Sequence, residues 1–193
     1  MAQGERRDQL LDAAALSIVD QGFLPLPLER LARRAHVSKA LIYAYFPTQH
    51  ELFNILLKRE LDELMAAGLD EASRLPRLED AASSCAMIYF DHVARNGPLL
   101  HILLSDLYMD GQHDRATLWA RDVVVRRLAR LARRSLTLPA KEIIAAVNLV
   151  IAIPEEAGTL LYTQEANPVL VRDLCRTLVL SAIKGLRSGG PST

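Results

Sequence analysis

The 193-residue sequence is poor in the residues that build disulfide-rich, loop-rich or β-rich proteins. It contains two cysteines, nine glycines, nine prolines and 5% aromatic residues. These counts exclude a disulfide scaffold and a collagen-like repeat, and they argue against a β-sandwich. The chain also lacks net charge, because 23 Lys and Arg residues balance 23 Asp and Glu residues. We therefore do not expect a simple polycation that binds nucleic acid by bulk charge.

Long apolar runs are also missing. The first residues, MAQGERRDQ, are polar, whereas a secretory signal needs an apolar stretch. The longest nearly unbroken apolar stretch, Ile143–Ile153, is interrupted by Asn148 and is shorter than the roughly 20 residues that span a bilayer. Cys85 and Cys175 lie among apolar neighbours, as buried reduced thiols do. We expect a cytoplasmic protein without a membrane partner.

The chain is rich in leucine and alanine at helical spacing. It has 34 Leu and 26 Ala, two of the best helix formers, and apolar residues recur every three or four positions. A first helix ends at Gly22, and short helices follow between Pro25 and Pro47. Longer helices are expected at 48–72, 79–95, 98–109, 113–135, 139–164 and 168–187. The sequence predicts an all-α fold of about nine helices.

Residues 27–46 have the layout of a helix-turn-helix, with a short helix, a tight break and a second helix. Pro27 can open the first helix, and Ser38 can cap the second. Ile42 and Phe46 are four positions apart and anchor the second helix inward, which leaves on its outer side Lys39, Leu41, Tyr43 and Ala44. Lysine and tyrosine side chains on such a helix suit the major groove of DNA. On this pattern alone, an ordinary helical hairpin is an equal alternative.

A resemblance to a known family favours DNA binding over the ordinary hairpin. Residues 33–47 are Arg-Arg-Ala-His-Val-Ser-Lys-Ala-Leu-Ile-Tyr-Ala-Tyr-Phe-Pro, followed at 48–53 by Thr-Gln-His-Glu-Leu-Phe. This run resembles the DNA-binding domain of the TetR family of regulators, and residues 7–23 resemble the first helix of that family. The similarity covers residues 6–60. It implies a DNA-binding domain at 1–47, in which the helix-turn-helix spans 27–46, and a ligand-binding and dimerisation domain at 48–193.

The resemblance also implies which residues contact DNA. The expected set comprises Arg34, Ser38, Lys39, Ala40, Leu41, Tyr43, Ala44, Tyr45, Thr48 and Gln49. Several positions depart from the usual family pattern. Family members commonly have Gly at the position of His36, Gly-Thr at the positions of Ala40 and Leu41, and His at the position of Ala44. Leu26 replaces a Thr or Ser, and Gln49 replaces a basic residue. These changes remove polar contacts, although Leu41 can meet a thymine methyl group.

Local charge predicts weak non-specific DNA binding. Residues 1–60 hold eight Lys and Arg residues against seven Asp and Glu residues, and phosphate neutralisation dominates non-specific affinity. Residues 121–134 contain six arginines and one acid. This segment is most simply the solvated face of an amphipathic helix, with a second surface for nucleic acid or an acidic partner as the alternative.

A mostly apolar ligand pocket with a few polar groups is expected in the middle helices. Soft, aromatic and polar-tipped side chains are concentrated there, and the candidates are Met87, Phe90, His92, His101, Leu104, Tyr108, Trp119, Asn148 and Glu155. Any single one of them is more simply an ordinary core or rim residue. The resemblance implies that a pocket exists but does not name its lining.

The last two helices carry wide apolar faces, which the resemblance assigns to a four-helix dimer interface. The candidate interface residues are Val147, Val150, Ile151, Leu161, Leu170, Leu174 and Leu178. A core helix pair within a monomer is the alternative.

No motif predicts catalysis, a cofactor or a metal site, since phosphate-binding loops, nucleophile motifs and metal-ligand spacings are missing from the sequence. We expect a homodimeric regulator, most simply a repressor, that binds double-stranded DNA at a palindromic operator and is released by a small apolar or amphipathic effector. The alternative is a helical dimer whose degenerate helix-turn-helix serves protein interaction or ligand sequestration.

Overall fold

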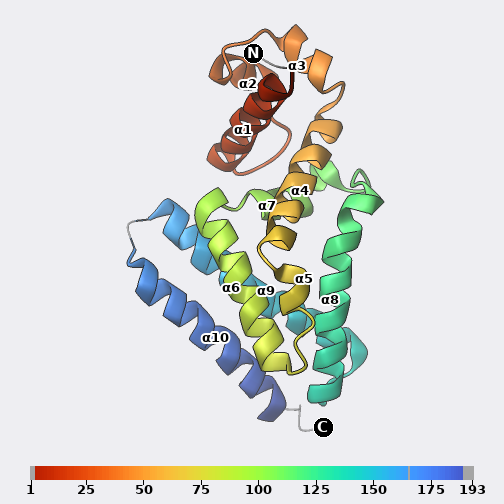
Figure 1. Ribbon diagram of the computed structural model, residues 1–193, viewed down its shortest axis with the longest axis vertical. Coiled ribbons are helices and arrows are strands. Elements are labelled where there is room, and N and C mark those ends of the chain that lie inside the picture. The colour runs from red at the N-terminus through yellow and green to blue at the C-terminus, as the bar shows by residue number, and fades with distance from the viewer. Residues whose placement is uncertain (1–2, 165, 189–193) are drawn as a thin grey trace. The chain divides into compact units, whose positions relative to one another are not determined.

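The protein is all-helical over the residues that the computed structural model describes, 3–164 and 166–188 (Figure 1). The N-terminal elements are α1 (Gln3–Gln21), α2 (Leu28–Arg34), α3 (Lys39–Tyr45), α4 (Gln49–Ala66) and α5 (Leu69–Ala72). They are followed by α6 (Leu78–Asn96), α7 (Leu99–Ser105), the 3-10 helix η1 (Leu107–Met109), α8 (Arg115–Ser135), α9 (Ala140–Thr163) and α10 (Pro168–Ser188). The predicted fold class is confirmed.

Two of the expected helices are interrupted. The helix expected at 48–72 ends at Ala66, and Gly68 adopts a left-handed φ of 93° before α5 begins. The helix expected at 98–109 ends at Ser105, because the Asp106 carboxylate accepts the backbone N–H of Tyr108 at 2.9 Å. Glycine favours left-handed backbone, and aspartate bonds to nearby backbone groups instead of continuing a helix.

The chain forms two compact units, and the first comprises Met1–Leu61 and Pro98–Leu118. This first unit holds α1, α2, α3, most of α4, and α7 with η1. Its core is aliphatic and aromatic, and its fully buried side chains include Leu10, Ile18, Leu31, Ile42, Phe46 and Phe53. The buried face of α3 is therefore held by the same core as α1 and α4.

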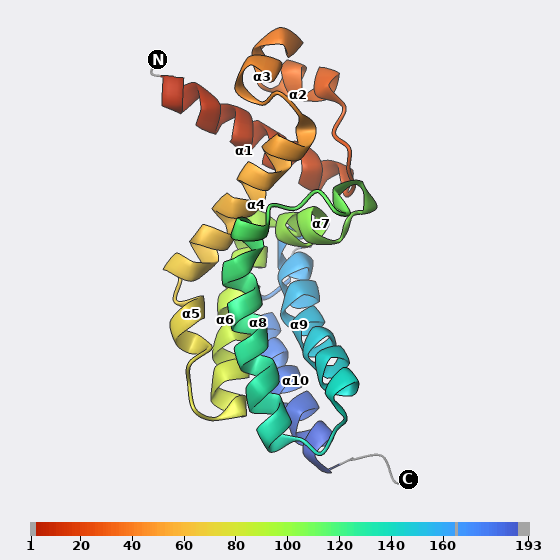
Figure 2. The same ribbon diagram turned by 90° about the vertical axis from the view of Figure 1, so that its right-hand side faces the viewer.

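The second unit comprises Asp62–Gly97 and Trp119–Thr193. Within it, α6, α9 and α10 pack on one another, and Figure 2 shows α8 running along the same bundle. The core takes residues from all four helices, among them Phe90, Ala132, Ile143 and Val179. Helix α9 comes very close to α6, since a Cβ atom added to Gly158 would lie 2.7 Å from Val93 Cβ.

Helix α9 carries more apolar surface than its own unit covers. By length and composition alone it could cross a membrane, with a mean hydropathy of 1.6, and 22% of the apolar window is buried. The short apolar stretch expected at Ile143–Ile153 is therefore part of a longer apolar helix. Its contacts with α6 and α10 cover only part of it, so much of its apolar surface is left uncovered within this unit.

Candidate functional site

The turn between α2 and α3 is held by a paired hydrogen-bond motif at the end of α2. The Val37 N–H donates to the Ala32 carbonyl at 2.9 Å, and the His36 N–H donates to the Arg33 carbonyl at 3.2 Å. This is the Schellman arrangement, in which the residue after the helix cap is left-handed. His36 has that conformation, with φ at 52°. The tight break is therefore made by the residue at which this sequence departs from the usual glycine.

Helix α3 begins as its sequence predicts. The Ser38 hydroxyl oxygen accepts the Leu41 N–H at 3.2 Å, so the predicted cap is confirmed. Ile42 and Phe46 are buried in the first unit. Helix α2 begins at Leu28 with Pro27 as its N-cap, one residue later than expected.

The outward side of α3 carries four of the predicted DNA-contacting residues. Lys39, Ala40, Tyr43 and Ala44 are exposed, and the exposed fraction of Tyr43 is 49%. Leu41 is half-buried. This arc offers an ammonium group, a phenol hydroxyl and two methyl groups, which can contact phosphates and base edges in a major groove.

Both cationic groups expected to contact DNA form ion pairs inside the first unit. The Lys39 ammonium lies 2.5 Å from a Glu29 carboxylate oxygen, and the Arg34 guanidinium lies 2.5 Å from Asp20. The hydrogen bond from Lys39 lowers the pKa of Glu29, and the same bond raises the pKa of Lys39. Lys39 is therefore charged but already neutralised, and phosphate must compete with Glu29 for it.

Thr48 and Gln49 differ from each other in role. The Thr48 hydroxyl oxygen accepts the Glu51 N–H at 3.1 Å and caps α4. The Gln49 side-chain oxygen accepts the Leu26 N–H at 2.9 Å, and Leu26 itself is 1% exposed. Two of the departures from the family pattern thus serve the packing of the loop before α2. Of the remaining predicted residues, Tyr45 is half-buried.

The segment after α7 is hydrogen-bonded to α4 and to the loop before α2 through side chains that sequence reasoning missed. The Asn54 amide donates to the Gln112 carbonyl at 2.8 Å, and its oxygen accepts the Asp114 N–H at 2.9 Å. The Asp106 carboxylate accepts the Leu24 N–H at 2.8 Å. Because these partners lie 58 to 82 positions apart, no local sequence signal could have revealed these hydrogen bonds.

The expected pocket residues are divided between the two units. His101, Leu104 and Tyr108 belong to the first unit. Tyr108 stacks on His50 with ring centroids 4.5 Å apart, so it adds to the contacts between α4 and the segment after α7. His101 is exposed and Leu104 is half-buried.

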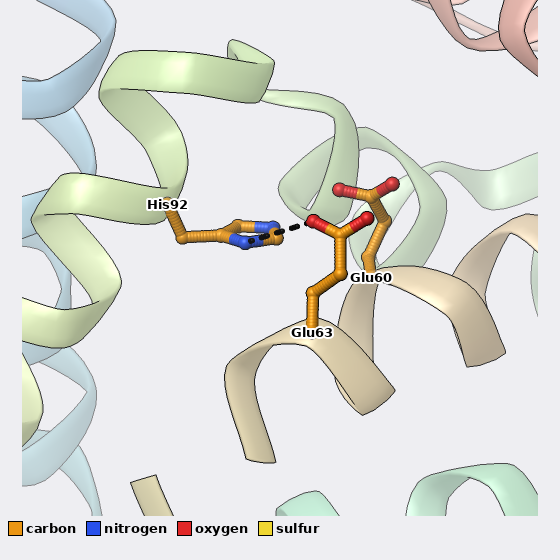
Figure 3. A group of neighbouring side chains, drawn as sticks. All are labelled: Glu60, Glu63 and His92. Carbon is orange, nitrogen blue, oxygen red and sulfur yellow. Dashed lines mark ion pairs between the residues drawn. The ribbon is translucent and has the colours of Figure 1, made fainter. Parts of the chain in front are cut away.

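In the second unit, the three candidates on α6 are buried. Met87 and Phe90 lie in the core of that unit. His92 is buried beside α4, where its Nδ1 lies 3.9 Å from a Glu63 carboxylate oxygen, as Figure 3 shows. Asn96 donates to the same carboxylate at 3.0 Å. Sequence reasoning singled out His92 but missed its acidic partner on another helix.

The polar candidates on α9 have different surroundings. Glu155 is half-buried and accepts a hydrogen bond from the Tyr89 hydroxyl at 3.4 Å. Burial raises the pKa of Tyr89, and the Glu155 charge adds to the effect. Tyr89 was not among the expected residues, although its amphipathic side chain suits a pocket wall. Asn148 and Trp119 are exposed.

The expected dimer residues fall into two groups. Val147, Val150 and Leu161 of α9 pack at the edge of the second unit's core, and Ile151 is half-buried. On α10, the exposed fractions of Leu170, Leu174 and Leu178 are 58%, 51% and 55%. These three leucines repeat every four residues and form an apolar stripe on one face of the helix.

Comparisons with known proteins agree with this geometry. Residues 10–56 match the family described as bacterial regulatory proteins, tetR family. A 74-residue segment is 38% identical to the HTH-type transcriptional activator FasR of Mycolicibacterium smegmatis, covering 38% of this chain but only 33% of FasR. The chain thus spans about a third of that relative's length.

Solved structures resemble the whole fold. A TetR-like transcriptional regulator from Rhodococcus sp. RHA1 has a TM-score of 0.69 at 20% identity, covering 96% of this chain and 99% of that one. The regulator FadR from Bacillus subtilis, solved in complex with stearoyl-CoA, has a TM-score of 0.64 at 17% identity, covering 90% and 97%. Because the identities are this low, the likeness concerns the fold alone, and the coverage shows that it includes both units.

Proposed function

Because this chain belongs to the TetR family of bacterial regulatory proteins, we propose that it is a cytoplasmic repressor that binds a palindromic DNA operator as a homodimer and is released by a small effector. The observation that carries the proposal is the capped and anchored α3, whose exposed arc presents Lys39 and Tyr43. Two copies of such a helix, related by a two-fold axis, match the symmetry of a palindrome.

The ion pairs of Lys39 and Arg34 determine how much these two cations contribute to DNA affinity. Lys39 and Arg34 leave carboxylate partners when they contact phosphate, so each contact exchanges one ion pair for another. Exposed ion pairs contribute only about 0–1 kcal/mol, and the exchange therefore costs little but also adds little. Sequence selectivity rests on the contacts of Tyr43, Leu41 and the two alanines with base edges.

The effector proposed for the second unit is a small apolar or amphipathic molecule. The support is the presence on α6 of the buried apolar side chains Met87 and Phe90 together with Tyr89, whose hydroxyl donates to Glu155 of α9. FadR, which shares the fold, binds stearoyl-CoA. An effector that binds one arrangement of α4 more tightly than another shifts operator affinity by the same coupling free energy.

Selection of bound duplexes from a random pool tests the proposal. We expect enrichment of one palindromic sequence, and we expect a metabolite extract to release it. Enrichment of no sequence, even at low salt, would favour the alternative in which the helix-turn-helix serves protein interaction.

A further inference from the structure

Helix α8 concentrates the positive charge of a chain that is neutral as a whole. Its span Arg115–Ser135 contains seven arginines and one aspartate, a net charge of +6. The rest of the chain is therefore net acidic. Its apolar residues Val124, Leu128 and Ala132 are buried in the second unit, so the arginines are confined to the outward side.

Three of these arginines form an unpaired row. Arg126, Arg130 and Arg133 are exposed and lie within one sector of about 60° of the helix, at roughly 100° per residue. Among the residues that the structure describes, none forms an ion pair or hydrogen bond with these three guanidinium groups. Their neighbour Arg127, in contrast, points to α5 and pairs with Asp70.

The first unit holds both paired and unpaired cations. Arg34, Lys39 and Arg59 are each paired with an aspartate or glutamate within that unit, whereas Arg30 and Arg33 of α2 are exposed and form no ion pair among the described residues. The row on α8 differs because it places three such cations on one side of a single helix, where they can neutralise an anionic partner without breaking an existing pair.

We propose that the row Arg126–Arg130–Arg133 is a second, sequence-independent contact surface for the phosphates of duplex DNA. The inference rests on the proposed function, because DNA is the polyanion that such a regulator meets. Guanidinium groups bind phosphate in a bidentate manner, and the three side chains are spaced along roughly 10 Å of helix. Because the apolar face of α8 is buried, the row binds by charge alone. Its contribution adds to the weak non-specific affinity expected from residues 1–60.

Binding of a random-sequence duplex at several salt concentrations tests this surface. The variant R126Q/R130Q/R133Q is compared with R74Q/R77Q/R95Q, which removes the same charge from exposed positions of the same unit. Fluorescence anisotropy between about 50 and 200 mM salt gives the slope of log K against log[salt]. We expect the α8 variant to reduce this slope by about 2.7 and the affinity at about 0.1 M salt by at least about tenfold. The control variant keeps both values, and circular dichroism verifies that both variants are folded.

Three outcomes would overturn the inference. The first is an unchanged slope in the α8 variant, and the second is no measurable binding of random duplex by the wild type. The third is a loss of binding to an acidic protein or anionic vesicles while DNA binding is kept. Failure of the proposed function is distinguishable, because a chain that selects no operator but shows the slope change still uses α8 to bind phosphate.

Discussion

At the scale of single residues, His36 is the position on which the helix-turn-helix geometry depends. Its left-handed backbone closes the two hydrogen bonds that end α2. For a residue with a Cβ atom this conformation costs roughly 1–2 kcal/mol, although histidine tolerates it better than most. The chain accepts this cost and still forms the turn.

Replacement of His36 by glycine is therefore expected to stabilise the protein. The relief of strain exceeds the extra entropy that glycine loses on folding, and we expect a gain of about 0.5–1 kcal/mol. Thermal unfolding followed by circular dichroism should show a rise of about 1–4 °C in Tm. H36A is the control, since it removes the imidazole but keeps the Cβ atom, and it should not raise the Tm. A lower Tm for H36G would contradict a strained turn.

At the scale of elements, the contact between α6 and α9 depends on the absence of a side chain. A Cβ atom added to Gly158 would lie 2.7 Å from Val93 Cβ and 3.0 Å from the Phe90 carbonyl oxygen, closer than ordinary contacts allow. Close packing of this kind responds sharply to an added methyl group.

The substitution G158A is expected to destabilise the second unit by about 1–3 kcal/mol, because overpacking forces the two helices apart. The matched control is G185A, a helical position where an added Cβ atom would meet no atom within 4 Å. There, alanine should stabilise by roughly 0.5–1 kcal/mol because of its higher helix propensity. Urea unfolding of both variants measures the difference. Equal effects of the two substitutions would show that Gly158 is not a packing constraint.

Elements were predictable from the sequence where their signals are local. The Ser38 cap, the end of α1 at Gly22 and the anchors Ile42 and Phe46 all follow from short-range spacing. The interruptions at Gly68 and Asp106 were missed because apolar periodicity continues across them.

Candidate-site contacts between distant segments were not predictable. Asn54 bonds to Gln112, Leu24 bonds to Asp106, and His92 meets Glu63. Each pairing depends on which helices the fold brings together, and a single sequence does not record it. Similarly, the exposed arc of α3 could be predicted, but the neutralisation of Lys39 by Glu29 depends on how α2 packs on α3.

At the scale of the whole molecule, uncovered apolar surface argues for a second copy of the chain. The stripe of Leu170, Leu174 and Leu178 is continuous on α10, and most of the apolar window of α9 is uncovered. Contiguous apolar surface of this kind marks an interaction site, and cyclic dimers bury the same patch on both subunits.

The double substitution L174E/L178E is expected to convert a dimer into monomers, because it places four carboxylates in the shared apolar patch. Sedimentation velocity measures the oligomeric state, with R95E as the control for an added negative charge at an exposed position. Affinity for a palindromic duplex should fall as the dimer is lost. A wild-type protein that sediments as a monomer would contradict the proposed interface.

The most direct test of the central proposal is the affinity of α3 variants for the duplex selected from a random pool. We expect Y43A to weaken binding by about 1–3 kcal/mol, roughly fivefold to 150-fold, without lowering the Tm. K39A should weaken binding by less, about 0–1 kcal/mol, because phosphate only replaces Glu29 as the partner of Lys39. The control K141A removes an exposed lysine from α9 and should bind as the wild type does. Unchanged affinity in both K39A and Y43A would contradict the assignment of α3 as the recognition helix.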